Sequence, residues 1–191
     1  MGGAPPAQPA APPRGAIALG LAPRFPPAVP ERLEGVEAAV VHEDRLDCAL
    51  VAARHPLARR RRIEARELAD VPFLFMDRAF HPGFYDRVYA ALATLGLAPR
   101  VEGTYDGLQA VWALAAHGQG WALGFHSQRA RPPAGTAAVR IAGLDLPFGL
   151  ELLARRGESS PAGRAGVDAF RGGTRAARRQ AMGSPSRGRG P

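Results

Sequence analysis

Hydrophobic and polar positions change their period in a regular way through the middle of the chain. The run "VPFLF" (71–75) is short, apolar and edged by proline, which predicts a buried strand of a parallel sheet. The segments 99–105 and 120–125 predict two further strands, and between the three lie two stretches with apolar residues at helical spacing. This order of strand, helix, strand, helix, strand predicts a right-handed βαβαβ lobe.

Both predicted helices carry signals at their ends. In "HPGFYDRVYAALATLG", Pro82 suits the first turn and Gly96 the C-terminal stop, and in "DGLQAVWALAAHG", Asp106 is the predicted N-cap and Gly118 the stop. The spacing predicts that the helices bury two apolar stripes, the first made of Phe84, Val88, Leu92 and Leu95 and the second of Leu108, Val111, Trp112 and Ala115.

More strands are predicted on either side of this lobe. "VEAAVV" and "RLDCALVAA" flank His42-Glu43-Asp44, whose polar residues suit a tight turn, so the two runs are expected to pair antiparallel. Strands are also predicted at "AIALGL", "AAVRIAG" and "FGLELLARR", and a weak helix at "AGRAGVDAF". The chain is thus expected to leave one sheet near residue 55, build a second lobe, and return near residue 138.

Low-complexity ends frame this body. The first segment is rich in Pro and Ala and the last in Arg, Gly and Ser, and neither holds enough apolar residues to offset the entropy of ordering. The predicted division is a disordered tail (1–15), a partial lobe I with the crossover (16–70), lobe II (71–137), the return strands and helix of lobe I (138–171), and a disordered basic tail (172–191).

The net charge of +8 is concentrated at the C-terminus. Residues 155–191 carry nine arginines against two acids, whereas residues 1–154 are nearly neutral, with sixteen arginines against fifteen acids. Within the body, Arg59 to Arg62 form one basic run. Acids follow it closely and no aromatic residue is interleaved to stack on bases, so the run is interpreted as a solvated connector, with nucleic-acid contact as the alternative.

Several kinds of site find no support in the sequence. Cys48, the single cysteine, cannot form an internal disulfide and has no partner at metal-ligand spacing, so a buried structural thiol is expected, and neither a metal nor a cofactor is predicted. No catalytic motif such as G-x-S-x-G or H-E-x-x-H is present, and the chain is predicted not to be an enzyme. Neither an export signal nor a membrane span is visible, which predicts a cytoplasmic protein without membrane contact.

Taken in order, several motifs resemble one family. "RHPLA", the strand entry "LADVPF" and "AVWALAAHGQGWALGF" are similar to the effector-binding domain of LysR-type transcriptional regulators, over about residues 16 to 172. The resemblance implies an α/β, two-lobed domain like the type 2 periplasmic binding proteins, with lobe II complete and lobe I partial. Such a domain closes on a small-molecule effector in the cleft between its lobes and controls DNA-dependent transcription.

The sequence also departs from this family. The DNA-binding helix-turn-helix and the first βαβ segment of lobe I are missing, so DNA contact is expected only through a domain absent from this chain. Where the family commonly has Leu-Pro or Val-Pro after the third strand of lobe II, this chain has Phe125-His126. Family members commonly dimerise, which suggests a homodimer. Two alternatives are a solute-binding protein of the same fold and a truncated fragment that senses nothing.

Candidate effector contacts follow from the predicted topology. Ligands of open α/β sheets bind at the carboxyl ends of the strands, where helix N-termini favour anionic groups. An arginine there could pair bidentately with a carboxylate, which makes Arg78 the leading candidate. His81 is interpreted mainly as a helix-start residue and His55 as part of the turn. The predicted effector-binding residues are Asp77, Arg78, His81, Thr104, Tyr105, Asp106, Phe125 and His126.

Overall fold

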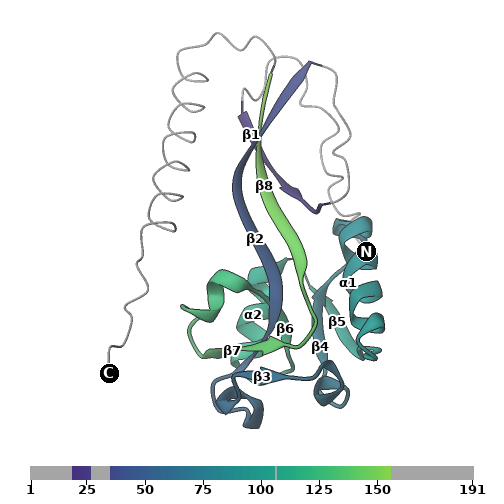
Figure 1. The fold of residues 1–191 in the computed structure, drawn as a ribbon, viewed down its shortest axis with the longest axis vertical. Helices are drawn as coiled ribbons and strands as arrows, with labels where there is room; N and C mark the ends of the chain where they lie inside the picture. The colour runs from purple at the N-terminus through teal and green to yellow at the C-terminus, as the bar shows by residue number, and fades with distance from the viewer. Residues whose placement is uncertain (1–18, 27–34, 106, 156–191) are drawn as a thin grey trace, which may run out of the picture. The chain divides into compact units, whose positions relative to one another are not determined.

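The chain divides into two compact units. The computed structural model describes residues 19–26, 35–105 and 107–155 (Figure 1). Among these, the larger unit comprises 44–148, and the smaller unit comprises 19–26, 35–43 and 149–155. Strands β2 (Val36–Ala52) and β8 (Leu146–Arg155) run through both units.

The larger unit carries both α-helices. Its elements, besides the parts of β2 and β8 that belong to it, are η1 (Pro56–Arg59), β3 (Arg62–Ile63), η2 (Ala65–Leu68), β4 (Phe73–Met76), η3 (Arg78–Phe80), α1 (Pro82–Thr94), β5 (Val101–Tyr105), α2 (Leu108–Ala116), β6 (Ala122–Phe125), η4 (His126–Arg129) and β7 (Thr136–Ile141). The strands and helices predicted between residues 71 and 125 are therefore confirmed.

Helices α1 and α2 cover opposite faces of the parallel strands (Figure 1). Successive residues of β4 point to opposite sides, as the pleat of a strand requires. Phe75 packs on Phe84 of α1, with ring centroids 5.6 Å apart, while Leu74 belongs to a buried cluster with Val111 and Ala115 of α2. The apolar stripes predicted from the sequence are thus the faces that cover β4, although Leu108 and Trp112 are only partly buried.

The predicted helix ends are largely confirmed. α1 begins at Pro82, and Gly96 just beyond the helix has a φ of 73°, a conformation that glycine adopts without strain. The N-cap of α2 is Gly107, one residue later than the predicted Asp106, and Asp106 itself lies outside the described residues.

The predicted hairpin around His42-Glu43-Asp44 is wrong, because residues 36–52 form one continuous strand. Tight hairpin turns need residues with positive φ, and among the described residues only glycines have one, with none between 42 and 44. The polar residues in the middle of β2 are exposed or half-buried strand positions, whereas every residue from Leu46 to Ala52 is buried. The polar residues at 42–44, whose composition is typical of a turn, therefore occupy an exposed stretch of a strand.

The buried half of β2 belongs to the six-stranded sheet, which an isolated bridge connects to the two-stranded sheet of β4 and β5. It pairs antiparallel with β6 on one side, through Cys48 and Gly124, and with β7 on the other, through Cys48 and Arg140. β3 adds to β7 in parallel, and β6 in turn bridges to β4 through Trp121 and Phe73. These pairings explain why the larger unit extends beyond the predicted range 71–137; the predicted lobe boundaries themselves stay a prediction.

The smaller unit is built from the first described strand, the first part of β2 and the last part of β8. β1 (Leu19–Arg24) pairs antiparallel with β8, from Leu19 opposite Ala154 to Arg24 opposite Gly149. The Arg24 Nε atom lies 3.1 Å from Glu151 Oε1, which gives that largely buried carboxylate a charged partner. β1 starts three residues later than the predicted run, whose first residues lie outside the described range, as does the predicted helix at 162–170.

Candidate functional site

Three parallel strands of the larger unit end at one edge. β4 runs parallel to β5, with Met76 opposite Tyr105, and a parallel bridge joins Phe73 to Trp121 just before β6. The residues at and after these strand ends include half-buried Tyr105 and Phe125. This edge has the position at which open α/β sheets bind ligands.

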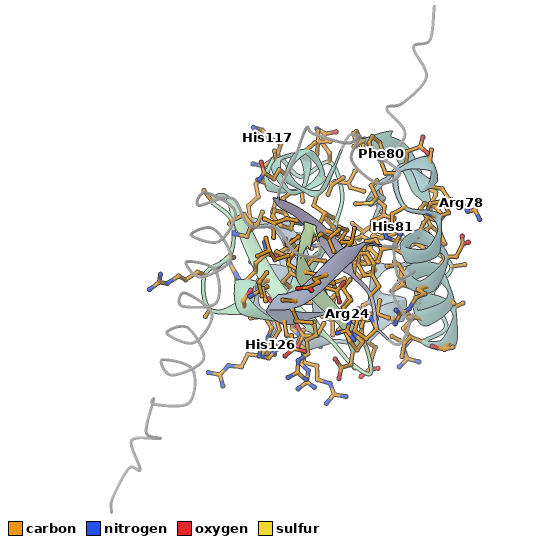
Figure 2. All side chains as sticks on the ribbon, turned by 90° about the horizontal axis from the view of Figure 1, so that it is seen from above. Arg24, Arg78, Phe80, His81, His117 and His126 are labelled. Atoms are coloured by element: carbon orange, nitrogen blue, oxygen red, sulfur yellow. The ribbon has the colours of Figure 1, made fainter. Side chains whose placement is uncertain are left out.

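The loop after β4 holds Asp77 and Arg78 in local contacts. Asp77 caps the short helix η3, its Oδ1 atom accepting a hydrogen bond from the Ala79 N–H at 2.7 Å. Arg78 donates two hydrogen bonds of 2.8 Å to the Asp86 carboxylate on α1, and these bonds raise the pKa of Arg78 and lower that of Asp86. Figure 2 shows the Arg78 side chain directed outward beside α1. A carboxylate ligand would have to compete with Asp86, so contact through Arg78 stays a prediction.

His81 is the N-cap of α1, with its Nδ1 atom accepting a hydrogen bond from the Phe84 N–H at 3.1 Å. This confirms its interpretation as a helix-start residue. Thr104 lies in β5 opposite Phe75, and its side chain is outside the described part of the chain. Three of the eight predicted contact residues therefore remain with described side chains at this edge. They are Tyr105, Phe125 and His126.

The turn after β6 is held by several contacts. The Phe125 ring packs against Phe148 and Trp112, at centroid distances of 4.7 and 6.0 Å. Its N–H donates to Gln128 Oε1 at 2.8 Å, while the Trp112 indole N–H donates to the Leu123 carbonyl oxygen at 3.0 Å. The turn is therefore a packed and hydrogen-bonded platform at the end of β6.

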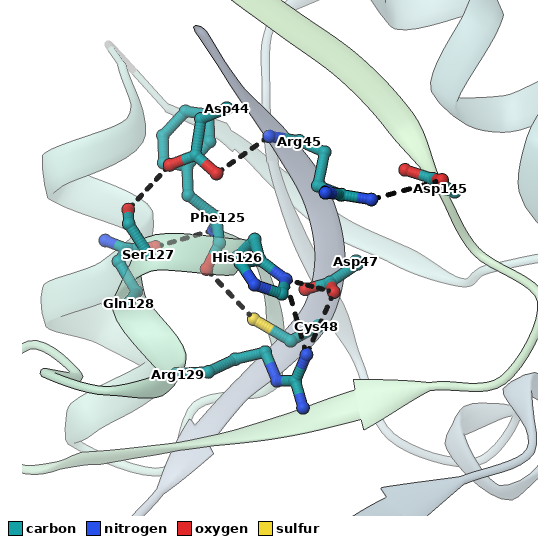
Figure 3. A network of polar contacts seen from close by, with 10 residues as sticks. All are labelled: Asp44, Arg45, Asp47, Cys48, Phe125, His126, Ser127, Gln128, Arg129 and Asp145. Carbon is teal, nitrogen blue, oxygen red and sulfur yellow. Dashed lines mark hydrogen bonds and ion pairs between the residues drawn. The ribbon is translucent and has the colours of Figure 1, made fainter. Parts of the chain in front are cut away.

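A charged cluster, Asp47 with His126 and Arg129, lies beside this platform (Figure 3). The Asp47 side chain is only 5% exposed, and its Oδ2 atom lies 2.8 Å from His126 Nδ1 and 3.2 Å from Arg129 Nη1. Its Oδ1 atom is buried and has no hydrogen-bond partner among the described residues. A buried carboxylate requires such charged partners, since its desolvation is otherwise costly.

Further polar contacts attach β2 to the same turn. The Ser127 hydroxyl donates to Asp44 Oδ2 at 2.6 Å, Asp44 Oδ1 accepts from the Arg45 N–H at 2.8 Å, and the Arg45 guanidinium lies 3.6 Å from Asp145 Oδ2 (Figure 3). The sequence analysis did not identify Asp47, Arg129 or this network. Its only local signal is an acidic residue inside an otherwise apolar run, "RLDCALVAA".

Cys48 is buried, as predicted, and its thiol lies 3.5 Å from the Phe125 carbonyl oxygen. Burial, and then the negative charge of Asp47, raise the pKa of this thiol from 9.0 to about 12. Because the thiolate is the reactive form, the arrangement is the opposite of an activated cysteine.

We therefore expect Cys48 to resist alkylation in the folded protein. With iodoacetamide at about pH 8, modification followed by mass spectrometry should be at least a hundredfold slower in native buffer than in denaturant, because folding removes both the thiolate and access to it. Similar alkylation rates in native buffer and in denaturant would show that the Cys48 thiol is not buried in the folded protein.

The connector with the four arginines is more ordered than predicted. Arg59 ends η1 and Arg62 begins β3, and all four side chains of the run are exposed. His55 caps η1 by accepting the Leu57 N–H at 3.2 Å, which confirms its structural role. Arg60 Nη1 lies 3.5 Å from Glu67 Oε2. A solvent-exposed connector is consistent with these positions.

The described residues contain neither a metal-ligand cluster nor a membrane-spanning helix. Among them, no group of three or more His, Cys, Asp or Glu residues is placed to hold a metal ion. None of their helices is both long and apolar enough to cross a membrane.

Comparison with known proteins gives a consistent result. The family model described as LysR substrate binding domain matches residues 18–175. The HTH-type transcriptional regulator TtuA of Agrobacterium vitis is 38% identical over 69 residues, which are 36% of this chain and 23% of TtuA.

Solved structures show the same fold. CbnR, a LysR family transcriptional regulator, superposes with a TM-score of 0.63 and 21% identity, covering 83% of this chain and 53% of CbnR. The effector binding domain of QuiR in complex with shikimate gives a TM-score of 0.61 and 19% identity, covering 83% of this chain and 72% of that domain. The chain thus spans about half the length of the CbnR regulator that it matches.

Proposed function

Because the chain belongs to the LysR substrate binding domain family, we propose that it is the effector-sensing portion of a LysR-type transcriptional regulator. It binds a small molecule at the edge where β4, β5 and β6 end, and binding controls DNA-dependent transcription. The observation that carries this proposal is the convergence of three parallel strand ends, with Tyr105, Phe125 and His126 beside them. That a second lobe completes the site stays a prediction.

The chemistry of this edge favours an anionic effector. β4 leads through η3 into the N-terminus of α1, and β5 leads directly into the N-terminus of α2. The N-terminus of α2, whose N-cap Gly107 offers no side chain, therefore turns free N–H groups and the positive end of the helix dipole toward the edge. α1 adds the positive end of its dipole, although Pro82 has no N–H and His81 binds the Phe84 N–H. Arg129 adds a positive charge near the end of β6, although its Nη1 atom is engaged with Asp47.

The remaining parts of the proposal concern partners. The relatives named above are transcriptional regulators, and we propose that DNA is bound through a separate helix-turn-helix domain. Formation of a homodimer, a cytoplasmic location and the lack of enzymatic activity stay predictions.

A thermal-melting screen tests the effector proposal. Small aromatic and aliphatic carboxylates, with the corresponding amides as uncharged controls, are added at increasing concentration. A carboxylate that binds only the folded state stabilises it by about 2.7 kcal/mol at a hundred times its Kd, which raises Tm by several degrees. We expect at least one carboxylate to do so and its amide to do less.

Two variants locate the binding site in the same screen. Tyr105→Ala, at the end of β5, should weaken the stabilisation by the active carboxylate. Arg66→Ala should leave it unchanged, because η2 precedes the amino end of β4 and its Arg66 is exposed. Stabilisation by none of the carboxylates, or equal losses in the two variants, would count against the site.

A further inference from the structure

His55, His81, His117 and His126 divide into two classes by what their Nδ1 atoms face. In His55 and His81 the Nδ1 atom accepts a backbone N–H, at 3.2 and 3.1 Å. A neutral ring in that position must carry its proton on Nε2. In His117 the Nδ1 atom lies 2.8 Å from the Ala113 carbonyl oxygen, which can only accept, so the neutral ring carries its proton on Nδ1.

His126 belongs to the second class because of a buried carboxylate. Its Nδ1 atom lies 2.8 Å from Asp47 Oδ2, and an ionised carboxylate only accepts hydrogen bonds. Arg129 Nη1 lies 3.3 Å from the same Nδ1 atom, a separation that follows from both groups donating to the shared Oδ2. The contact with Asp47 therefore leaves Nε2 as the unprotonated nitrogen of the neutral ring.

The exposures of the two side chains show what this arrangement presents to solvent. Asp47 is 5% exposed and His126 48% exposed, so the carboxylate is enclosed while the ring projects from the end of β6. Asp47 is fixed from two sides, by His126 and by Arg129, while its other oxygen has no partner within the part of the chain that the structure describes. The Asp47 carboxylate thus fixes the orientation of the His126 ring and is itself too buried for a ligand to contact.

We propose that Asp47 is a positioning residue, which holds His126 so that Nε2 accepts a hydrogen bond from a hydroxyl group of the effector. This inference rests on the proposed function and narrows the effector class to small carboxylates that also bear a hydroxyl. The N-terminus of α2 favours the carboxylate, and a neutral imidazole nitrogen with a free lone pair accepts a hydrogen bond from the hydroxyl group.

Nuclear magnetic resonance tests the positioning role without any ligand. Long-range 1H–15N correlation spectra of the uniformly 15N-labelled full chain, at about pH 8 where histidine is mostly neutral, distinguish the two tautomers. His126 is assigned by the loss of its signals in His126→Gln. We expect His126 and His117 to show the Nδ1–H pattern and His55 and His81 the Nε2–H pattern. An Nε2–H or mixed pattern at His126 would overturn the proposal.

Matched variants separate positioning from a merely structural role. Asp47→Asn keeps a carbonyl acceptor and should preserve the Nδ1–H pattern of His126, whereas Asp47→Leu removes the acceptor and should give a mixture of tautomers. His117 reports in both whether the end of α2 is intact, since its partner is the Ala113 carbonyl of the same helix, which neither substitution touches. If Asp47→Leu fails to fold, Arg129→Gln provides the test, because it removes the second partner of Asp47 and leaves the carboxylate in place. A changed tautomer of His126 in Arg129→Gln would contradict the assignment of its proton to Nδ1 through Asp47.

Pairs of probes that differ by one hydroxyl test the ligand contact. Binding of lactate is compared with propionate, and of 3-hydroxybenzoate with benzoate. In the wild type we expect the hydroxylated member of at least one pair to bind about two- to tenfold more tightly, and in His126→Phe the difference should disappear. Equal binding of both members of each pair in the wild type would overturn the acceptor role while leaving the proposed function intact. Binding by none of the four would count against both, and the tautomer spectra would still decide the role of Asp47.

Discussion

Gly120→Ala is expected to lower the free energy of unfolding by about 3 kcal/mol. A Cβ atom at this position would lie 2.3 Å from the Pro72 carbonyl oxygen and 3.0 Å from Leu74 Cγ. The backbone would have to move, and with it the hydrogen bond of 2.8 Å from the Trp121 N–H to that same oxygen. Because this bond joins the start of β6 to β4, the change weakens the parallel strands that form the candidate site. Urea denaturation measures the loss.

Gly83→Ala provides the matched control. Gly83 is exposed in the first turn of α1, and a Cβ atom there would meet nothing within 4 Å. An alanine should raise stability by about 0.4 to 1 kcal/mol, because it restricts the unfolded chain more than the folded one. If the two glycine variants changed stability in the same direction and by similar amounts, the close approach at Gly120 would not be the cause.

Trp121→Ala is expected to cost about 3 to 5 kcal/mol, the usual range for removing a large buried aromatic side chain. Trp121 is fully buried, and its ring stacks on Phe73 with centroids 4.3 Å apart. Its loss would leave a cavity between β6 and β4. The variant should unfold at much lower urea concentration, with intrinsic fluorescence and circular dichroism reporting the transition.

Trp121→Phe separates the ring from its polar group. The indole Nε1 atom is buried without a hydrogen-bond partner among the described residues, so replacing the indole breaks no hydrogen bond. Phenylalanine retains a stacked ring and leaves a smaller cavity, and it should cost well under half as much as alanine. A loss of stability as large as that of Trp121→Ala would mean that the indole N–H contributes to stability although it has no described hydrogen-bond partner.

The parts of the fold with a strong periodic signal could be predicted from the sequence. α1 and α2 combine apolar residues at helical spacing with Pro82 at the start of the first helix and a glycine just beyond each end. Short strand-like runs before, between and after these helices predict β4, β5 and β6. Local sequence determines such elements because side-chain burial and helix capping act within a few residues.

Strand pairing was harder to predict, because it depends on residues far apart. β2 was divided into two strands since its exposed middle has the composition of a turn, and β3 was missed since two residues among arginines give no periodicity. Both errors have one cause: a strand is defined by its hydrogen-bonded partners, and β7, the partner of β2 and β3, lies more than 70 residues later in the chain.

The candidate site shows the same limit. His126 can be identified because it follows a strand of the predicted lobe, but its partner Asp47 lies 79 residues earlier, and a single acidic residue in an apolar run does not indicate which group it contacts. Arg78 was the leading candidate from its position, yet Asp86, one helical turn into α1, already occupies its guanidinium. Which charged groups meet is decided by the topology, and the residue types alone do not reveal it.

The pairing of β1 with β8 has a consequence for the order of folding. Leu19 lies opposite Ala154, a separation of 135 residues, whereas the larger unit is continuous in sequence from 44 to 148. During synthesis the ribosome releases the whole larger unit before the last strand emerges, and β1 has no β8 with which to pair until then. Such distant contacts raise the contact order and slow folding, so the smaller unit should acquire protection from hydrogen exchange last.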